Sequence, residues 1–425
     1  IAERIGRLAQ PLRAALRVAS VEGEDFTAEV IARVLGIDER DMVPRLSSEL
    51  DRRHRLVRAQ AIERLGAGRL SRYRFRNYLF QKYLYDHLDQ VERVYLHEDV
   101  GNALEGLHGG QANEGADIAD ILATAPVAVQ LAWHFQEAGI TDQAIHYLHQ
   151  AGDRAVQLSA YQEAIAHLDR GMALLMTLPD PGGEGGPSAP EHRQERAELE
   201  LNLQLSLGMA WKGNIPNPEG ERALTRACEL CQETGRLAEL CRVLGELSMF
   251  PYVRAEYQTA REMVEEALSL AQQVGDPLLV ALHQWHLGYV LFGLGEYATA
   301  RAHLDQVISF YRPREHHHSF VFVRGSDAGL SALAYDACCL WCLGYPEQAL
   351  ERSQEALALA RELDHPFSLA DVLCLAGCVI NELRRDAQAL KDHAEELERL
   401  SEDLGFLSFA PTGTCYRGDA LTKLG

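Results

Sequence analysis

Apolar residues recur at the spacing of an α-helix along nearly the whole chain. The first stripe runs from Ile5 to Leu16, and stripes of the same period resume at about Ile118. Side chains three and four residues apart share one face of an α-helix, so this pattern predicts a long series of amphipathic helices. The fold class that we expect is therefore all-α, with one small exception near the N-terminus.

Residues 1–108 contain that exception. Three helical stripes are followed by two short runs that flank a glycine-containing turn, and this order predicts a β-hairpin. Three helices followed by a small β-wing is the plan of a winged-helix domain, so we expect residues 1–108 to form a winged-helix-like domain, with Thr27 as a helix N-cap. The two runs, the turn and the two helices that follow are Leu56–Gln60, Tyr73–Phe75, Gly66–Gly68, Tyr78–His87 and Val91–Leu107.

A short phrase in the second half of the chain occurs twice. Glu256–Arg261 returns as Glu296–Arg301, 40 residues later, and each copy opens an amphipathic run. Each copy contains one alanine, Ala260 or Ala300, that has a small residue twelve positions before it. Small side chains at this spacing allow two neighbouring helices to cross closely, so the phrase predicts a repeated helix pair.

The same pair of small residues occurs six times, which is the pattern of tetratricopeptide (TPR) repeats. We therefore expect residues 118–425 to form an α-solenoid of TPR-like helix pairs, after a linker at residues 109–117 that is rich in glycine. The pairs are Gly152 with Ala164, Gly208 with Gly220, Ser248 with Ala260, Gly288 with Ala300, Ala337 with Ala349 and Gly377 with Ala389.

The register of the repeats slips at two places. Residues 179–190 are rich in glycine and proline and predict a flexible loop. Residues 313–325 are an insertion of aromatic and charged character, which we also expect to be a loop. Loops of this kind on a rigid scaffold often carry binding residues. Since no polar capping helix closes the array, we expect the solenoid to continue beyond Gly425.

Charge and cysteine content limit the functions and cellular compartments that fit this chain. The net charge is −21, although residues 1–80 hold 16 basic and 11 acidic residues and are therefore basic. An acidic surface repels nucleic acid and anionic membranes. The nine cysteines lie mostly in apolar helical runs, which is typical of reduced thiols in a cytosolic protein. We see no signal peptide and no uninterrupted apolar run of 18 residues, so we expect a cytoplasmic protein without a membrane span.

Several stretches resemble bacterial STAND signal-transduction ATPases, in both their winged-helix segment and their TPR arm. These are large regulators that are often joined to a cyclase or kinase domain, and the resemblance covers nearly the whole chain. It implies a winged-helix plus TPR sensor arm, with an upstream ATPase module in the same protein as a partner. The stretches are Val18–Phe26, Glu49–Val57, Tyr73–Arg76, Tyr95–Glu98, Leu343–Leu350 and His365–Ala370.

The resemblance also implies nucleotide-facing residues, Arg76 and Asn77. In the family, a winged-helix histidine that follows an aromatic–Arg pair can face the phosphates of ADP. Asn77 stands in its place here, and an amide can donate a hydrogen bond but cannot carry a charge. A simpler alternative is that Asn77 caps the helix after it. The chain has no Gly-x-x-x-x-Gly-Lys-Ser/Thr loop, so we expect no ATP or ADP cofactor in these residues and no ATPase activity from them alone.

Two groups of residues are candidates for contact with a ligand or protein partner. Aromatic and imidazole side chains on the first helix of a TPR pair can line the concave side of the array, although core packing is an alternative. The second group lies at or after the register slip, where loop packing is the alternative. The candidates are His283, Trp285 and His286 in the first group, and Arg324, Asp327 and Tyr335 in the second.

Other chemistries are poorly supported. The cysteine pair Cys228 and Cys231 and the group from Cys338 to Cys342 have metal-like spacing but lie within helices, and His316–His318 fits a solvated loop, so we expect no metal site. The acidic third helix, Asp38–Asp51, would repel DNA phosphates. No catalytic motif is present.

The sequence therefore predicts a non-catalytic sensor arm that binds a small-molecule or protein signal and relays it. A passive TPR scaffold is the alternative.

Overall fold

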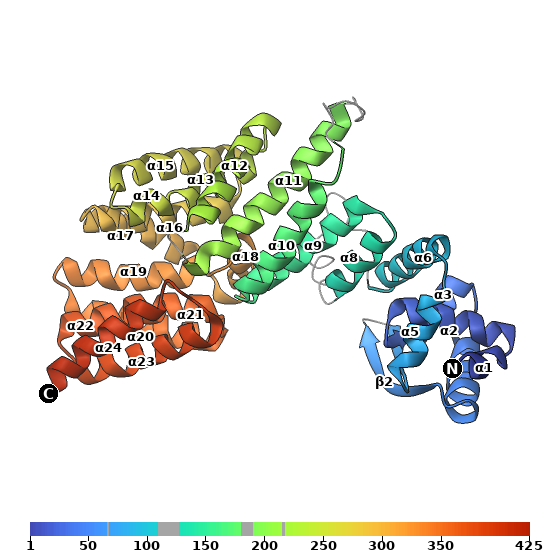
Figure 1. Cartoon of the computed structure of the whole chain (residues 1–425). Helices are drawn as coiled ribbons and strands as arrows, with labels where there is room; N and C mark the ends of the chain where they lie inside the picture. Colours follow the sequence, from blue (N-terminus) through green and yellow to red (C-terminus); the bar gives the residue numbers. More distant parts are fainter. Residues whose placement is uncertain (66–67, 109–126, 180–189, 215–216) are drawn as a thin grey trace. The chain divides into compact units, whose positions relative to one another are not determined.

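The computed structural model describes residues 1–65, 68–108, 127–179, 190–214 and 217–425, in two compact units, Ile1–Ala151 and Gly152–Gly425. The fold class is confirmed: helices dominate, with one small sheet near the N-terminus and a TPR-like solenoid after it (Figure 1). The predicted linker 109–117 lies outside the described residues. The predicted boundaries, residues 1–108 and 118–425, therefore stay a prediction.

The first unit combines short helices with a three-stranded antiparallel sheet in the order β1-β3-β2. Its core centres on Phe26 of β1, whose ring lies 5.1 Å from Phe75 and 6.1 Å from Tyr73, both on β3. The elements are α1 (Ala2–Gly6), α2 (Gln10–Glu22), β1 (Asp25–Thr27), α3 (Ala28–Leu35), α4 (Glu39–Pro44), η1 (Arg45–Arg53), β2 (Val57–Leu65), β3 (Gly68–Phe75), α5 (Tyr78–Asp86), α6 (Gln90–His108) and α8 (Ala128–Glu137).

The predicted hairpin is present, and both strands are longer than predicted. Strand β1 was not predicted, because a three-residue strand is too short to show alternation. Thr27 is the N-cap residue of α3, as predicted. Its side chain makes no capping hydrogen bond, because its hydroxyl donates to the Glu22 carboxyl at 3.0 Å instead. The third predicted helix divides into α4 and the π-helical η1, and Pro44 lies where the two join.

Glu22 is a buried carboxyl beside a small cavity of about 90 Å³ that Thr27, Arg72 and His108 also line. Burial raises the pKa of Glu22 to about 8. The folded state therefore keeps a proton that the unfolded chain loses above about pH 4.5. Stability is then lost as pH rises from about 4.5 through 8, at about 1.4 kcal/mol per pH unit.

Glu22→Gln should remove this dependence, so that urea unfolding followed by circular dichroism gives a more stable first unit than wild type at pH 8.5 and little difference at pH 5. Glu24→Gln, at an exposed position nearby, is the control and should keep the wild-type slope. An unchanged slope in Glu22→Gln would contradict the assigned pKa.

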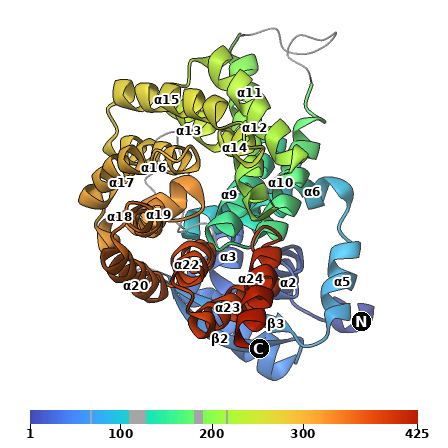
Figure 2. The same ribbon diagram turned by 90° about the vertical axis from the view of Figure 1, so that its left-hand side faces the viewer.

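The second unit is a curved array of antiparallel helix pairs. In Figure 2, helices α13, α16 and α19 lie on the inner side of the curve, and α15, α17 and α20 lie on the outer side. The elements are α9 (Thr141–Gln157, which contains the boundary between the units), α10 (Tyr161–Leu175), α11 (Pro190–Ala210), η3 (Trp211–Asn214), α12 (Pro218–Thr234), α13 (Leu237–Leu247), α14 (Met249–Val253), α15 (Tyr257–Val274), α16 (Pro277–Gly293), α17 (Tyr297–Phe310), α18 (Pro313–Arg324), α19 (Ala328–Cys342), α20 (Pro346–Leu363), α21 (Pro366–Val372), η4 (Leu373–Val379), α22 (Ile380–Arg384), α23 (Ala387–Leu404) and α24 (Ala410–Leu424).

Contact distance explains the small residues of the repeat. A Cβ added at Gly288 of α16 would lie 2.6 Å from Leu304 of α17, and one added at Gly208 would lie 2.3 Å from Leu224. Gly152 meets Leu168 in the same way, at 2.6 Å. A leucine of the second helix thus fills the space that the absent side chain leaves, which holds each pair close together.

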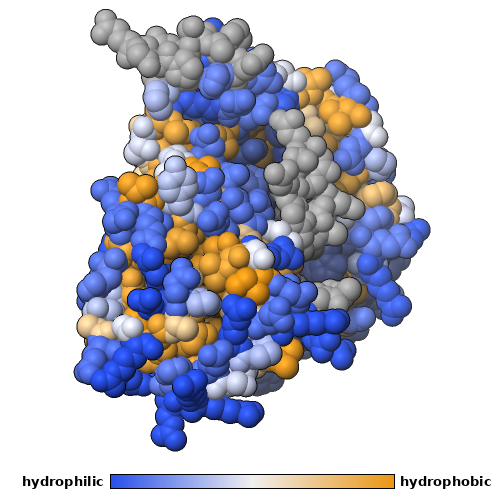
Figure 3. All heavy atoms as spheres, turned by 90° about the vertical axis from the view of Figure 1, so that its right-hand side faces the viewer, coloured by the Kyte–Doolittle hydropathy of each residue, from blue (hydrophilic) through white to orange (hydrophobic). Residues whose placement is uncertain are grey.

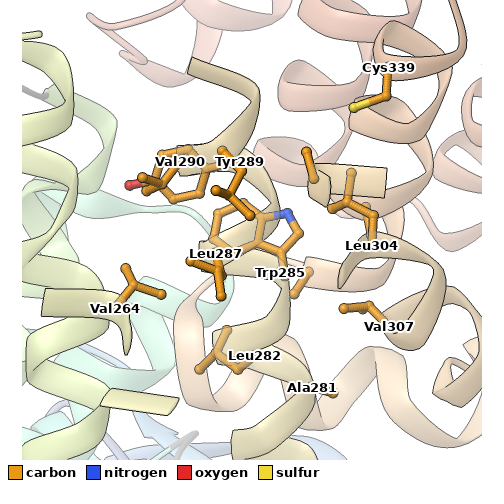
Figure 4. Packing of buried hydrophobic residues seen from close by; sticks show 14 of the residues in the cluster. Val264, Ala281, Leu282, Trp285, Leu287, Tyr289, Val290, Leu304, Val307 and Cys339 are labelled. Atoms are coloured by element: carbon orange, nitrogen blue, oxygen red, sulfur yellow. The ribbon is translucent and has the colours of Figure 1, made fainter. Parts of the chain in front are cut away.

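The core of the array is richest around α16, which is buried on several sides. Trp285 and Tyr289 are the two largest fully or nearly fully buried side chains, and their rings lie 5.2 Å apart. Figure 4 shows these rings beside Leu304 and Val307 of α17 and Cys339 of α19. One continuous cluster therefore joins successive repeats.

The insertion at 313–325 is not a loop as predicted. It forms helix α18, which begins after Arg312 with Pro313 in its first turn and ends at Gly325 in the left-handed region, at φ 71°. Both are ordinary helix boundary signals. The prediction that His316–His318 lies in a solvated loop is wrong for the same reason, and His317 is buried.

The surface of the protein is more hydrophilic than its core. The face shown in Figure 3 is mostly hydrophilic, with smaller hydrophobic patches.

The stretch Pro366–Arg384 is the one run among the described helices whose length and mean hydropathy of 1.5 would allow it to cross a membrane. It is 56% buried and packs against α19, α20 and α23, which is the environment of a core helix in this array.

Candidate ligand site on the inner helices

Charged and imidazole side chains from four elements of the second unit meet where η3, α13, α16 and α18 come together. We call this group, with the indole that it surrounds, the inner polar cluster. Its members are Lys212 of η3, Arg242 and Glu246 of α13, His283, Trp285 and His286 of α16, and Arg324 of α18. Five of the seven are at most 4% exposed, and Arg242 and Glu246 are partly exposed.

A glycine brings α13 against the imidazoles of α16. A Cβ at Gly245 would lie 2.7 Å from Cε1 of His283 and 3.0 Å from Cε1 of His286. The two rings are stacked, with centroids 5.3 Å apart. The absence of a side chain at Gly245 therefore makes the room that both imidazoles occupy.

Arg324 ends α18 and projects onto α16. Its guanidinium carbon lies 3.8 Å from the centroid of the Trp285 ring, which is cation–π geometry. Its backbone carbonyl accepts a hydrogen bond of 2.8 Å from Nζ of Lys212, and one of its terminal nitrogens donates to Ser326. The inserted helix thus supplies the central cation of the cluster.

Glu246 is the acid of the cluster, but its contacts are long. Its Oε2 lies 3.5 Å from Nζ of Lys212, and its Oε1 lies 3.8 Å from His286 and 3.7 Å from Nε of Arg324. Only the first of these is within the upper limit of a hydrogen bond. The carboxylate therefore neutralises charge without being tightly held.

Several polar atoms of the cluster have no hydrogen-bond partner among the described residues. A buried polar atom without a partner costs about 1–3 kcal/mol and is rare in native proteins, so a group of them marks a strained or functional site. The atoms are both ring nitrogens of His283, Nε1 of Trp285, Nε of Arg242, Nε of Arg324 and Oε1 of Glu246.

Burial also shifts the protonation of the cluster. Desolvation, with the nearby Arg324 charge, lowers the pKa of Lys212 to about 7 from its ordinary value near 10.5. Desolvation lowers the pKa of His283 to about 4 and holds that of His286 well below its ordinary value. At neutral pH both imidazoles are therefore neutral, and Lys212 is poised between its two forms. Perturbed pKa values of this kind are typical of functional sites.

Four of the six predicted ligand residues belong to this cluster: His283, Trp285, His286 and Arg324. Tyr335 lies nearby on α19, with its ring 6.1 Å from Tyr289, and is partly buried. Their contact with a ligand stays a prediction. The structure nevertheless brings Arg324, which was chosen from a separate stretch of sequence, onto Trp285 of the first group.

Asp327 has a different environment. One carboxylate oxygen accepts from the backbone N–H groups of Gly329, at 2.8 Å, and Leu330, at 3.2 Å, and thereby caps α19. The other accepts from the Tyr311 hydroxyl and from Nδ1 of His317, which lies 2.7 Å away. Both oxygens are thus engaged inside the protein, and its predicted ligand contact stays a prediction.

In the first unit, Arg76 and Asn77 both have partners within the chain. Arg76 donates to the Val57 carbonyl at 2.8 Å and to the Asp51 carboxylate at 2.6 Å. Asn77 accepts from the Leu79 N–H at 2.9 Å, so it caps α5, which confirms the simpler alternative. Whether either residue faces a nucleotide stays a prediction.

Sequence reasoning missed Lys212, Arg242 and Glu246. Lys212 is one of only four lysines in the chain and follows Trp211 at the end of an apolar helix, which was an available signal. Arg242 and Glu246 are four residues apart and so share one face of α13, but that spacing also fits an ordinary surface pair. Their burial arises from neighbouring repeats, which no local pattern shows.

The two ends of the array are joined close to this site. Nε2 of His365, at the start of α21, lies 3.0 Å from the Gln157 carbonyl at the end of α9 and 3.4 Å from the Ser159 hydroxyl. The rings of Tyr161 and Phe367 lie 5.5 Å apart in edge-to-face contact. Residues about 200 positions apart in sequence therefore close the curve of the second unit.

No family model matches the chain, and no curated protein matches it at a significant level. Among solved structures, the chain is similar to a Rap protein complexed with competence and sporulation factor (13% identity, TM-score 0.47, 77% of this chain and 91% of that one). It is also similar to the apo form of the quorum sensor NprR from B. thuringiensis (12%, 0.43, 82% and 92%).

A STAND protein with a TPR sensor from Pyrococcus horikoshii is a further similar structure (12% identity, TM-score 0.40). That match covers 96% of this chain, and the chain spans 66% of the length of that protein. At these identities and TM-scores, the similarities carry no information about ligand or activity.

Proposed function

We propose that residues 152–425 are a non-catalytic regulatory module that binds a peptide or protein segment at the inner polar cluster. The observation that carries this proposal is the set of buried donors without partners around Arg324 and Glu246. A purely structural cluster would gain stability if these atoms were paired or replaced by apolar groups. A ligand that pairs them explains why they are kept.

The position of the cluster also supports a regulatory role. Its central cation comes from α18, an insertion between two regular helix pairs, and Lys212 joins η3 to that insertion. The contact between His365 and the end of α9 closes the same array. A ligand that moved α18 would therefore act on several repeats at once.

A more specific function follows from the resemblance of the sequence to STAND signal-transduction ATPases. In it, residues 1–108 are a winged-helix-like domain that relays the bound state to an upstream nucleotide-binding module of a STAND-type protein. A passive TPR scaffold is the competing function, and it requires no change in such a module when a partner binds.

A ligand screen tests the proposed function. The whole chain is mixed with pools of random pentapeptides, and thermal unfolding is followed. A pool that contains a ligand at 100 times its Kd should raise the free energy of unfolding by about 2.7 kcal/mol. Arg324→Met should abolish the shift, whereas Arg314→Met, at an exposed position on the same helix, should retain it. A shift that persists in Arg324→Met would place the site elsewhere.

A further inference from the structure

The chemistry of the inner polar cluster specifies the ligand group that it accepts; the inference rests on the proposed function and deepens it. We propose that the cluster binds a carboxylate of the ligand, and that this carboxylate takes the place between Lys212 and Arg324 that the Glu246 side chain now fills. The ligand is therefore an acidic peptide segment or a free peptide C-terminus.

The unpartnered atoms favour an acceptor. Among the described residues of the cluster, Nε of Arg242, Nε of Arg324 and Nε1 of Trp285 all carry a hydrogen and have no acceptor. Each neutral imidazole also has one N–H, and neither ring nitrogen of His283 has a partner within the described chain. A ligand that satisfied these groups must offer several acceptor lone pairs, as a carboxylate does.

The charge of the cluster also favours an anionic ligand. Lys212, Arg242 and Arg324 can each be positive, whereas Glu246 is the one acid among the described residues that forms an ion pair within 4 Å with two of them. Asp371 of α21 also acts on Lys212 and Arg324, but burial raises its pKa and so favours its neutral form. A buried surplus of positive charge is costly unless an anion compensates it.

Glu246 fits the role of an exchangeable occupant. Its Oε1 accepts no hydrogen bond from any described residue, although a guanidinium and an imidazole lie within 3.8 Å. Its side chain is 11% exposed, more than those of Lys212 at 3% and Arg324 at 4%. Glu246 and Arg242 are thus the members of the cluster that solvent touches, and a better-placed carboxylate could displace the Glu246 side chain.

Exchange of the carboxylate would change the protonation of Lys212. The charged groups that face this amine are Arg324 of α18, Glu246 of α13 and Asp371 of α21, while His286 of α16 is neutral. A ligand carboxylate in closer contact than Glu246 raises the pKa of the amine, so the complex takes up a proton at pH 8, where the free protein is mostly deprotonated at Lys212.

Four pentapeptide pools test the inference by calorimetric titration of the whole chain at pH 8. They combine a free or amidated C-terminus with the presence or absence of aspartate and glutamate, which separates the two sources of a carboxylate. The pool without any carboxylate should bind at least about tenfold more weakly than the best pool that has one, because a charge-assisted contact is lost. Titrations in HEPES and in Tris should reveal uptake of up to one proton per bound peptide.

Matched variants complete the experiment. Lys212→Met should remove both the preference for a carboxylate and the proton uptake. Lys391→Met, on α23 and outside the cluster, should keep both. Glu246→Gln should strengthen binding of the carboxylate pools, because the competing anion is gone.

Equal binding of the pools with and without a carboxylate would overturn the inference and leave the proposed function intact. So would binding of a carboxylate pool in wild type without proton uptake at pH 8, together with unchanged binding in Lys212→Met. If none of the four pools binds wild type, the proposed function fails and the inference falls with it.

Discussion

Asp327→Ala should lower the free energy of unfolding of residues 152–425 by about 3 to 5 kcal/mol. The change removes the cap of α19 and leaves the Tyr311 hydroxyl and the buried His317 imidazole without their shared acceptor. The loss of a cap alone costs about 1 kcal/mol. The remainder comes from buried donors that can no longer reach an acceptor, each at about 1–3 kcal/mol.

Asp276→Ala is the matched control, because Asp276 caps the neighbouring inner helix α16 through a single hydrogen bond of 2.8 Å to the Leu278 N–H. It should cost only about 1 kcal/mol. Chemical denaturation of both variants measures the difference. Equal losses in the two variants would contradict the account of Asp327 as the acceptor for three separate segments.

Gly288→Val should cost about 3 kcal/mol of the free energy of unfolding. The first added carbon would lie 2.6 Å from the Leu304 side chain, and a valine brings two further methyl groups into the same space. The leucine is completely buried and cannot rotate into solvent, so α16 and α17 must move apart. The expected result is a fall of several degrees in Tm, with broader unfolding of the array.

Gly418→Val provides the comparison for that variant. Gly418 lies on an exposed face of α24, and an added Cβ meets nothing within 4 Å. Its effect should stay within about 0.5 kcal/mol. If Gly288→Val were equally mild, close helix crossing would not be the reason for the small residues in the repeat.

The helix pairs could be predicted because their cause is local. The spacing of twelve between small residues reflects one helix pair and a short turn, so the sequence itself shows it. In the structure, Gly288 lies against Leu304 and the Ala300 carbonyl. Helix α18 was missed although Pro313 and Gly325 bracket it, because its register breaks the repeat and aromatic residues suggested an exposed loop. Strand β1 is defined by pairing with β3, 49 residues away at Asp25 and Arg74, which no local pattern reveals.

The candidate site could be predicted only in part for the same reason. His283, Trp285 and His286 share a short stretch and drew attention by residue type. Glu246 and Lys212 are 34 residues apart, and Lys212 and Arg324 are 112 apart, so their meeting depends on the curvature of the whole array. The sequence shows which residues are polar, but only the fold determines whether such a residue is buried beside another charged residue.

Thermal unfolding of Lys212→Met at pH 7, with and without a binding peptide pool, tests most directly whether the inner polar cluster is a binding site. Methionine keeps the length of the side chain and removes a buried amine whose pKa is depressed. The account predicts that the free variant is as stable as wild type or more stable, and that the shift in Tm caused by the pool disappears. A variant that is destabilised by several kcal/mol and still shows the full peptide-induced shift would contradict the account and identify the cluster as structural.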